Sequence, residues 1–336
     1  MASTLHDKLQ QLGDLELAIL VALISEEHCI LSSSSNSTEN LKEELHLVCS
    51  ELFGLQVATI DCSAQTNVDE FSEAILVDVA DEDDHDSFDR EIGSRTQSAV
   101  PGSDRFGGVN NTLDNRRIAD VIIAKNIDLA SPNVQVQTLE LLRTKRIFTR
   151  TAMHLAPKSL LFVAVVSKPE ARLTHHLNDM FAMSHFHDAD LGFSRTEDRF
   201  EGQHSTNGFH QNEVKSLRVQ ARNVHITAEM AGYLHNVVIF MRLSRYVKSG
   251  VTATATRNLR TLAKTLASLH GLEFLTPSLV ALAARKIYPH RLVLATSETE
   301  RSLQWGSDPE AVRQMMDGLT VELVIEEVIA SVESPL

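Results

Sequence analysis

Short apolar runs that alternate with helical patterns constrain this chain more than any other feature. Four runs are typical of buried strands: 28–31 (HCIL), 55–62 (LQVATIDC), 118–124 (IADVIIA) and 159–166 (SLLFVAVV). Between them, apolar residues at helical spacing predict helices over 12–24, about 39–53 and 131–144. Strands that alternate with helices usually pair in parallel, with helices on both faces of the sheet. The sequence therefore predicts a three-layer α/β core.

The C-terminal third has a different pattern, which is helical from about residue 227 to the end. Amphipathic helices are expected over 231–247, 256–271, 276–292 and 321–332. Thr276 is suited to cap the third of these, because Pro277 follows at the first helical position. A small all-α domain is therefore predicted to follow the core.

Two polar segments separate the ordered parts. Residues from about 81 to 115 and from 188 to 222 hold little that could be buried, so ordering them would cost more entropy than burial returns. We therefore divide the chain into an α/β core over 1–187 with a disordered insertion at about 81–115, a flexible polar linker over 188–222, and a helical domain over 223–336.

Charge and composition exclude several classes of protein. The net charge of -14 disfavours nonspecific binding to nucleic acid or to an acidic membrane, because polyanions would be repelled. Apolar runs stay shorter than a membrane span requires. Cys29, Cys49 and Cys62 show no metal-binding spacing and are expected to be buried free thiols. We expect an intracellular protein, in the cytoplasm or alternatively the nucleus.

A serine-rich loop at residues 32–37 raises the question of a nucleotide site. The apolar run before it predicts a strand, and Leu41 and Leu45 begin the helical pattern after it. Strand, small-residue loop and helix are the layout of a phosphate-binding loop. This loop has no glycine and is followed by Thr38 and Glu39, so an ordinary polar turn is the alternative.

The order of these parts resembles the MoxR and magnesium-chelatase-ATPase-subunit branch of the AAA+ ATPases. The resemblance rests on three segments: the run into the loop (13–31), the segment ADVIIAKNIDLASPNVQVQTLELL (119–142), and the C-terminal stretch from Gly250 to the closing HRL at 290–292. The motif LNDMF at 177–181 also matches the motif that carries an arginine finger in that family. The resemblance implies a P-loop NTPase-like core with a parallel sheet and a helical lid.

The family's catalytic positions can be carried over one at a time. In the phosphate-binding loop, Ser32 and Ser37 stand within the loop, Thr38 at the lysine and Glu39 at the magnesium-binding hydroxyl. Lys125 and Asn126 stand at the Walker B acidic pair, and we expect Lys125 to end the strand adjacent to the loop. The resemblance also places Lys168 at sensor one, Met180 at the arginine finger and Thr254 at sensor two. Arg257 lies one turn further on and could substitute for the lid arginine, although the motif does not support it.

None of these positions carries the residue type that magnesium-assisted hydrolysis needs. The resemblance therefore implies a pseudo-ATPase, acting as a scaffold or regulatory subunit, with no catalytic residue, bound cofactor, metal or identifiable small-molecule substrate. The first alternative is a magnesium chelatase-like or MoxR-type ATPase subunit with residual ATP and magnesium binding and hydrolysis. The second is a nucleotide sensor that binds without turnover.

Two further patterns bear on metal binding and on protein partners. A metal site is one interpretation of four histidines, His175, His176, His185 and His187, of which the last two would share one strand face. We expect solvated histidines instead, because no cysteine or acidic cluster lies nearby in the sequence.

An apolar stripe over 321–332 has an acidic back. It could pack on the protein's own lid or dock onto a partner. We expect self-association or a protein partner through this stripe.

Overall fold

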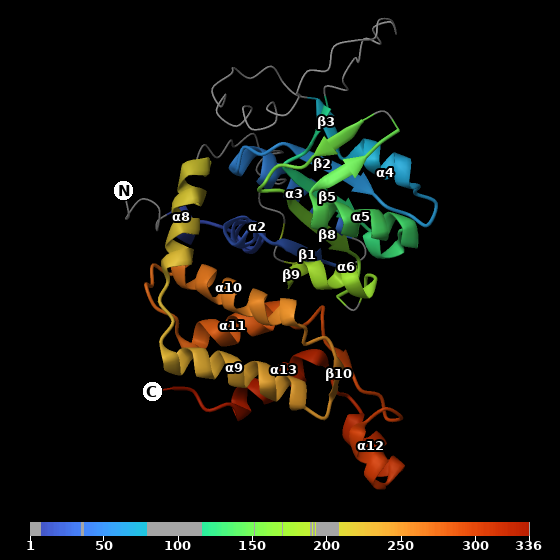
Figure 1. Cartoon of the computed structure of the whole chain (residues 1–336), viewed down its shortest axis with the longest axis vertical. Coiled ribbons are helices and arrows are strands. Elements are labelled where there is room, and N and C mark those ends of the chain that lie inside the picture. Colours follow the sequence, from blue (N-terminus) through green and yellow to red (C-terminus); the bar gives the residue numbers. More distant parts are fainter. Residues whose placement is uncertain are drawn as a thin grey trace, which may run out of the picture.

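A five-stranded parallel sheet forms the centre of the molecule, with strand order β2-β5-β8-β1-β9 (Figure 1). The computed structural model describes residues 8–34, 37–78, 116–150, 152–169, 171–188, 190, 192 and 208–335. The strands are β1 (His28–Ser32), β2 (Val57–Asp61), β5 (Val121–Lys125), β8 (Leu161–Val166) and β9 (Phe181–Phe186). The predicted α/β core with a parallel sheet is confirmed. The predicted insertion at 81–115 lies outside the described residues.

Helices cover both faces of the sheet, which explains why the strands are apolar on both sides. On one face, Leu31 and Val163 contact α2 (Asp14–Ser25) and α3 (Thr38–Leu47). On the other face, Ile30 and Phe162 pack with α4 (Val68–Ala74), α5 (Pro132–Thr144) and α6 (His175–Met180). Three layers result, as the alternation of strands and helices predicted.

Two small antiparallel hairpins project from the core. One pairs β3 (Leu76–Asp78) with β4 (Arg116–Ile118), and the other pairs β6 (Arg146–Phe148) with β7 (Met153–Leu155). The second hairpin connects α5 to β8 and was not expected from the sequence, because strands of three residues give too short a pattern to detect.

The C-terminal region is a helical lid packed below the core (Figure 1). Its helices are α8 (Gln211–Asn223), α9 (Ala228–Leu243), α10 (Ala253–Leu269), α11 (Pro277–Ile287), α12 (Pro309–Met316) and α13 (Val321–Ser331), with a 3-10 turn η4 (Arg301–Trp305) and a small sheet of β10 (Val247–Ser249) and β11 (Val293–Leu294). Thr276 and Pro277 open α11 as predicted. None of the helices within the described ranges is long and apolar enough to span a membrane.

Helix α8 corrects the prediction of a flexible linker over 188–222. Val214, Leu217 and Ala221 are buried at helical spacing and join the core cluster, and α8 packs against α2 and α10. The polar composition of this segment hid a stripe of only three apolar residues. Most of the linker before residue 208 lies outside the described residues.

The apolar stripe of α13 is also not the docking surface that was expected. Val324, Ile325 and Val328 are at most 5% exposed and pack within the lid, where α13 contacts α9 and α11. Arg285 on α11 pairs with Glu326 on the polar side of α13. The stripe is part of the protein's own core, which is the first of the two alternatives that the sequence left open.

Candidate functional site

The serine loop joins the end of β1 to the start of α3, as the sequence predicted. Ser32 is the last residue of β1, Ser37 is the N-cap of α3 and Thr38 is its first helical residue. The hydroxyls of Ser34 and Ser37 lie 3.0 Å apart and hydrogen bond to each other. This loop therefore lies at the carboxyl edge of the sheet, where open α/β sheets bind ligands.

An ion pair between Lys125 and Glu39 spans this edge. The Lys125 ammonium at the end of β5 donates to the Glu39 carboxylate in the first turn of α3. Strand β8 lies between β5 and β1, so β5 is not the adjacent strand that was expected, yet Lys125 still reaches the helix. Glu39 and Lys125 thus bind each other across this edge of the sheet.

Lys42 extends this pair into a network of four charges. Its ammonium also binds Glu39 and lies 3.1 Å from a carboxylate oxygen of Asp61 at the end of β2. The hydrogen bonds from Lys125 and Lys42 hold the pKa of Glu39 below its ordinary value. The charges of Lys42 and Lys125 are therefore balanced by those of Glu39 and Asp61.

Asn126 and Lys168 occupy turns at the same edge. Asn126 has φ 55°, a left-handed conformation that asparagine tolerates better than most residues, and its N–H donates to Val165 O at 2.8 Å. The left-handed backbone of the turn after β5 therefore explains why an asparagine stands at this position. Lys168 is exposed in the turn after β8, where its carbonyl accepts from Ala171 N–H.

Met180 and Thr254 lie at the opposite edge of the sheet. Met180 ends α6 immediately before β9, whose first residue Phe181 pairs with His28 at the start of β1. Thr254, in the first turn of α10, hydrogen bonds to Asp179. Because β1 has five residues, these positions are separated from the serine loop by roughly 16 Å of strand.

Arg257 is also on this far side, close enough to Glu27 before β1 to affect the pKa of that carboxyl. The structure therefore does not support Arg257 as a substitute for the lid arginine at the serine loop.

Two motifs that carried the resemblance bind each other at the junction of core and lid. The Arg291 guanidinium pairs with the Asp179 carboxylate and donates to the carbonyls of Asp179 (3.0 Å) and Phe181 (2.5 Å). His290 donates to Phe181 O at 2.9 Å. Burial lowers the pKa of His290 to about 3, so its ring stays neutral at physiological pH. The HRL and LNDMF motifs thus fix the lid on the core.

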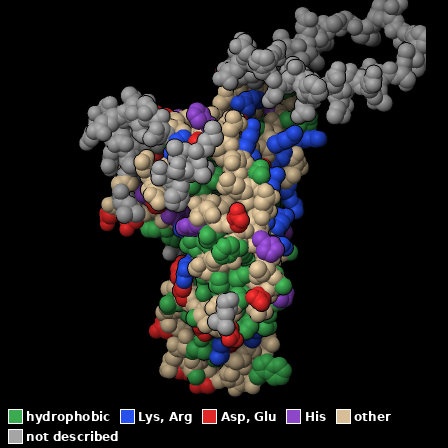
Figure 2. Space-filling model, turned by 90° about the vertical axis from the view of Figure 1, so that its left-hand side faces the viewer, with side chains coloured by type: hydrophobic (Ala, Val, Ile, Leu, Met, Phe, Trp, Pro, Cys, Tyr) green, Lys and Arg blue, Asp and Glu red, His purple; other side chains and the backbone are tan. Residues whose placement is uncertain are grey.

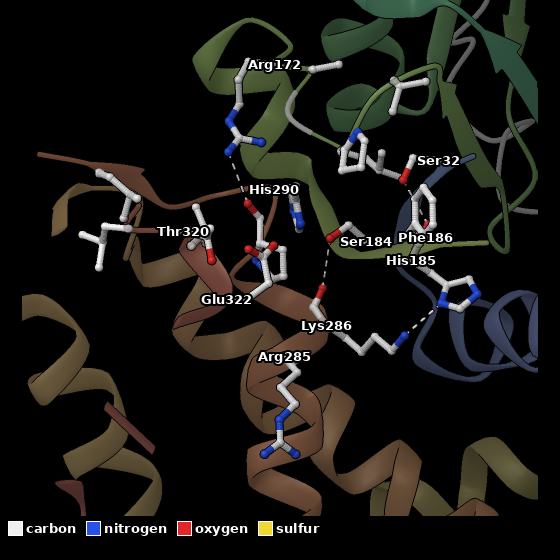
Figure 3. A pocket seen from close by; sticks show the side chains of 18 residues that line it. Ser32, Arg172, Ser184, His185, Phe186, Arg285, Lys286, His290, Thr320 and Glu322 are labelled. Atoms are coloured by element: carbon white, nitrogen blue, oxygen red, sulfur yellow. Dashed lines mark hydrogen bonds between the residues drawn. The ribbon is translucent and has the colours of Figure 1, made fainter. Parts of the chain in front are cut away.

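A cleft of about 520 Å³ opens between core and lid beside the end of β1 (Figure 3). Ser32 and Val166 line it from the sheet, whereas Glu39 and Lys125 do not. Its cations already contact protein groups: Arg172 donates to Pro289 O, Arg285 pairs with Glu326, and Lys286 lies 2.8 Å from His185 Nδ1. The three cations that line the cleft are therefore each already in contact with a group of the protein.

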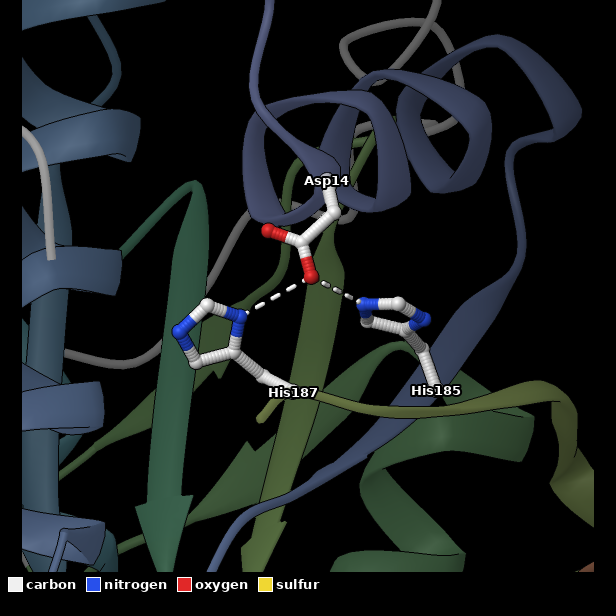
Figure 4. A group of neighbouring side chains, drawn as sticks. All are labelled: Asp14, His185 and His187. Atoms are coloured by element: carbon white, nitrogen blue, oxygen red, sulfur yellow. Dashed lines mark hydrogen bonds and ion pairs between the residues drawn. The ribbon is translucent and has the colours of Figure 1, made fainter. Parts of the chain in front are cut away.

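The histidines at the end of β9 are not solvated, which corrects the expectation from the sequence. His185 Nε2 and His187 Nδ1 lie 3.0 and 2.9 Å from the same carboxylate oxygen of Asp14 (Figure 4). Burial alone would raise the pKa of Asp14, but the hydrogen bonds from both histidines hold it well below its ordinary range. Sequence reasoning found the histidine pair and missed Asp14, which lies 171 residues before His185.

Comparisons with known proteins support the fold. The chain superposes on the crystal structure of a proposed ATPase from Cytophaga hutchinsonii with a TM-score of 0.63 and 16% identity, covering 95% of this chain and 89% of that one. A full-length MCM homologue from Methanopyrus kandleri superposes with a TM-score of 0.44 and 12% identity, over 83% of this chain and 56% of that one, and no conclusion rests on it. No family model matches the sequence.

One curated relative is similar in sequence. Maintenance of telomere capping protein 2 from the yeast Lachancea thermotolerans is 28% identical over 116 residues, which cover 33% of this chain. The match covers 41% of the yeast protein.

The sheet order, the helical lid and the superposition together define the class of fold. The chain has a P-loop NTPase-like AAA+ fold.

The junction of core and lid yields a testable prediction. In Arg291→Met, the partly buried Asp179 carboxylate loses its counter-charge, and we expect a loss of about 3 kcal/mol in the free energy of unfolding. The pKa of Asp179 is depressed in the folded state, since burial is outweighed by hydrogen bonds from Thr252 and the charge of Arg291. This stabilisation is therefore present above about pH 4 and disappears as pH falls below it.

Urea unfolding at pH 7 and pH 3 measures both effects. The matched control is Arg313→Met, which breaks an exposed pair with Glu310 and should change little. Equal losses for the two variants at pH 7 would show that the buried pair does not fix the lid.

Proposed function

We propose that this chain is a pseudo-ATPase of the MoxR or magnesium-chelatase type, which acts as a scaffold or regulatory subunit. The ion pair between Glu39 and Lys125 is the observation that carries the proposal. In the family that the sequence resembles, these two positions hold magnesium against the nucleotide phosphates. Here a carboxylate and an ammonium neutralise each other at the same place.

The electrostatics of the helix N-terminus support this proposal. The first turn of a helix attracts an anion, and phosphate-binding loops use that attraction. The Glu39 carboxylate lies in the first turn of α3 and supplies the negative charge itself. A phosphate group would meet like-charge repulsion from Glu39, and a magnesium ion would meet it from Lys125.

The alternative, a chelatase-like or MoxR-type ATPase subunit with residual ATP binding and hydrolysis, would need another phosphate site. The cleft between core and lid is the candidate, because Arg172 and Lys286 line it beside Ser32. Both side chains already contact protein groups, so ATP would have to displace those contacts. This favours the scaffold over the enzyme.

The relative from yeast agrees with a scaffold role. Its name, maintenance of telomere capping, describes no enzymatic step. A chain that keeps a complete sheet and lid without the groups for hydrolysis is most simply explained by a surface that another protein binds.

The β6–β7 hairpin is the surface we propose for that partner. Phe148, Met153 and Leu155 share its outer face and are 60, 47 and 59% exposed, whereas Ile147 is buried beneath. Four exposed cations lie close to them in the sequence, Arg143, Arg146, Arg150 and Lys158, and Arg150 pairs with Asp69 of α4. Lys and Arg side chains also gather along one edge of the upper half of the molecule in Figure 2.

Charge complementarity determines the partner's chemistry. Residues 143–158 contain cations and no carboxylate, in a chain with a net charge of -14. A face of this kind fits an acidic peptide segment with interspersed apolar side chains, because apolar contacts add to the attraction between charges. We propose an acidic segment of a partner protein as the occupant.

Millimolar magnesium-ATP should leave the melting temperature unchanged and release no phosphate. A ligand at a hundred times its dissociation constant stabilises a protein by about 2.7 kcal/mol, which would raise the melting temperature by roughly 5–10 °C for a domain of this size. Thermal unfolding with and without magnesium-ATP, and phosphate release, measure the two quantities. A magnesium-dependent shift would favour a nucleotide sensor, and steady phosphate release would establish an enzyme.

A fluorescent acidic peptide with spaced Phe and Leu residues should bind the hairpin. Phe148→Ser and Arg146→Glu should each weaken binding by about tenfold or more, which is about 1.4 kcal/mol. Fluorescence anisotropy measures the affinity, and Leu243→Ser, which removes another exposed apolar side chain, is the control. Equal affinity for all variants would contradict the proposal, and tighter binding of single-stranded DNA would make the hairpin a nucleic-acid surface instead.

A further inference from the structure

The cluster of Asp14, His185 and His187 has the composition and spacing of a metal site (Figure 4). His185 and His187 come from β9 and the residue that follows it, and Asp14 comes from the first turn of α2. One possible ligand atom from each residue lies within 4.8 Å of the other two. The His187 side chain is 2% exposed and that of His185 is 13% exposed, whereas the Asp14 side chain is 37% exposed, so the two histidines are shielded from water and the carboxylate remains accessible.

The distances between the ligand atoms fit a tetrahedral ion. Zinc binds imidazole nitrogen and carboxylate oxygen at about 2.0–2.2 Å, which places tetrahedral ligands roughly 3.3 Å apart. The two histidine nitrogens lie 3.0 and 2.9 Å from the shared oxygen of Asp14. Two of the three separations are therefore within a few tenths of an ångström of those around a tetrahedral ion, and the two histidine nitrogens lie within 4.8 Å of each other.

Each ring nitrogen of His187 faces an oxygen, an arrangement that either a doubly protonated ring or a metal ion at one nitrogen satisfies. Its Nδ1 faces the Asp14 carboxylate, and its Nε2 faces the carbonyl of Gly192 at 3.1 Å. A neutral imidazole has one N–H, so it cannot donate to both oxygens. An ion at Nδ1 leaves the remaining N–H for Gly192. A hydrogen bond from a metal-binding histidine to a backbone carbonyl is the usual way in which the ring is oriented.

Lys286 opposes an ion at this cluster. Its ammonium lies 2.8 Å from Nδ1 of His185, the ring nitrogen that faces away from Asp14. When Nε2 binds an ion, Nδ1 carries the ring proton and faces that ammonium, so two positive groups meet. Removing the charge of Lys286 should therefore strengthen binding, which gives the inference a test that a nonspecific surface site would not pass.

We propose that Asp14, His185 and His187 form a binding site for one zinc-class divalent transition-metal ion. The site goes beyond the proposed scaffold function and does not depend on it, since it is separate from the Glu39–Lys125 pair. It would hold the first turn of α2 against the end of β9. Because Lys286 belongs to α11, the site would also respond to the position of the lid.

Zinc and cobalt titrations of the full chain, purified with a chelator that is then removed, test the site. We expect one equivalent of zinc by calorimetry, and a cobalt absorption spectrum typical of tetrahedral coordination. Asp14→Asn and His185→Gln should each weaken zinc binding by at least about tenfold. Lys286→Met should strengthen it, and His175→Asn, which changes an exposed histidine outside the cluster, should leave it unchanged.

Circular dichroism checks that each variant is folded, and either ligand variant suffices if the other fails to fold. If neither folds, the cobalt spectrum of the wild type and the effect of Lys286→Met decide. Zinc binding that survives both ligand substitutions would overturn the proposal, and so would the absence of binding below millimolar zinc. An affinity that Lys286→Met leaves unchanged would also place the ion elsewhere.

Discussion

The buried pair between Arg291 and Asp179 holds the two halves of this protein in one arrangement. Arg291 is 2% exposed at its side chain and ties the lid to the backbone at the start of β9. One hydrophobic cluster continues from the sheet through α2 into α8, α10 and α11, so the lid has no separate core. Replacing one partner of such an ion pair leaves the other charge unpaired in a poorly solvated place. The position of the lid against the start of β9 depends on this contact.

A second set of charges determines what the carboxyl edge of the sheet can bind. In a working P-loop enzyme, phosphates and magnesium supply the charges that the protein's own groups balance. Here Glu39, Lys42, Asp61 and Lys125 balance one another. The same fold can therefore stay stable at this edge without a nucleotide, and selection for chemistry is not needed to explain its shape. Fold and function are separable in this way because a site is a small set of side chains on a larger scaffold.

Patterns within short stretches of sequence predicted most of the fold. The buried strands at 28–32, 121–125 and 161–166 were visible as apolar runs, and Thr276 with Pro277 located the start of α11. The predictions that failed concerned features that depend on contacts between distant residues. The α13 stripe gave no sign of whether it faced the lid or a partner, and α8 was hidden by polar neighbours. Asp14 could not be joined to His185 and His187, because no local pattern links positions so far apart in the chain.

We propose that Glu39 and Lys125 neutralise each other at the positions where the family that the sequence resembles binds magnesium and phosphate. A crystal structure grown at neutral pH with millimolar magnesium-ATP tests it most directly. We expect direct contact between the two side chains, with no phosphate or magnesium density between α3 and the end of β5. Density for a phosphate group or a hydrated magnesium ion in that space, with the two side chains apart, would contradict it.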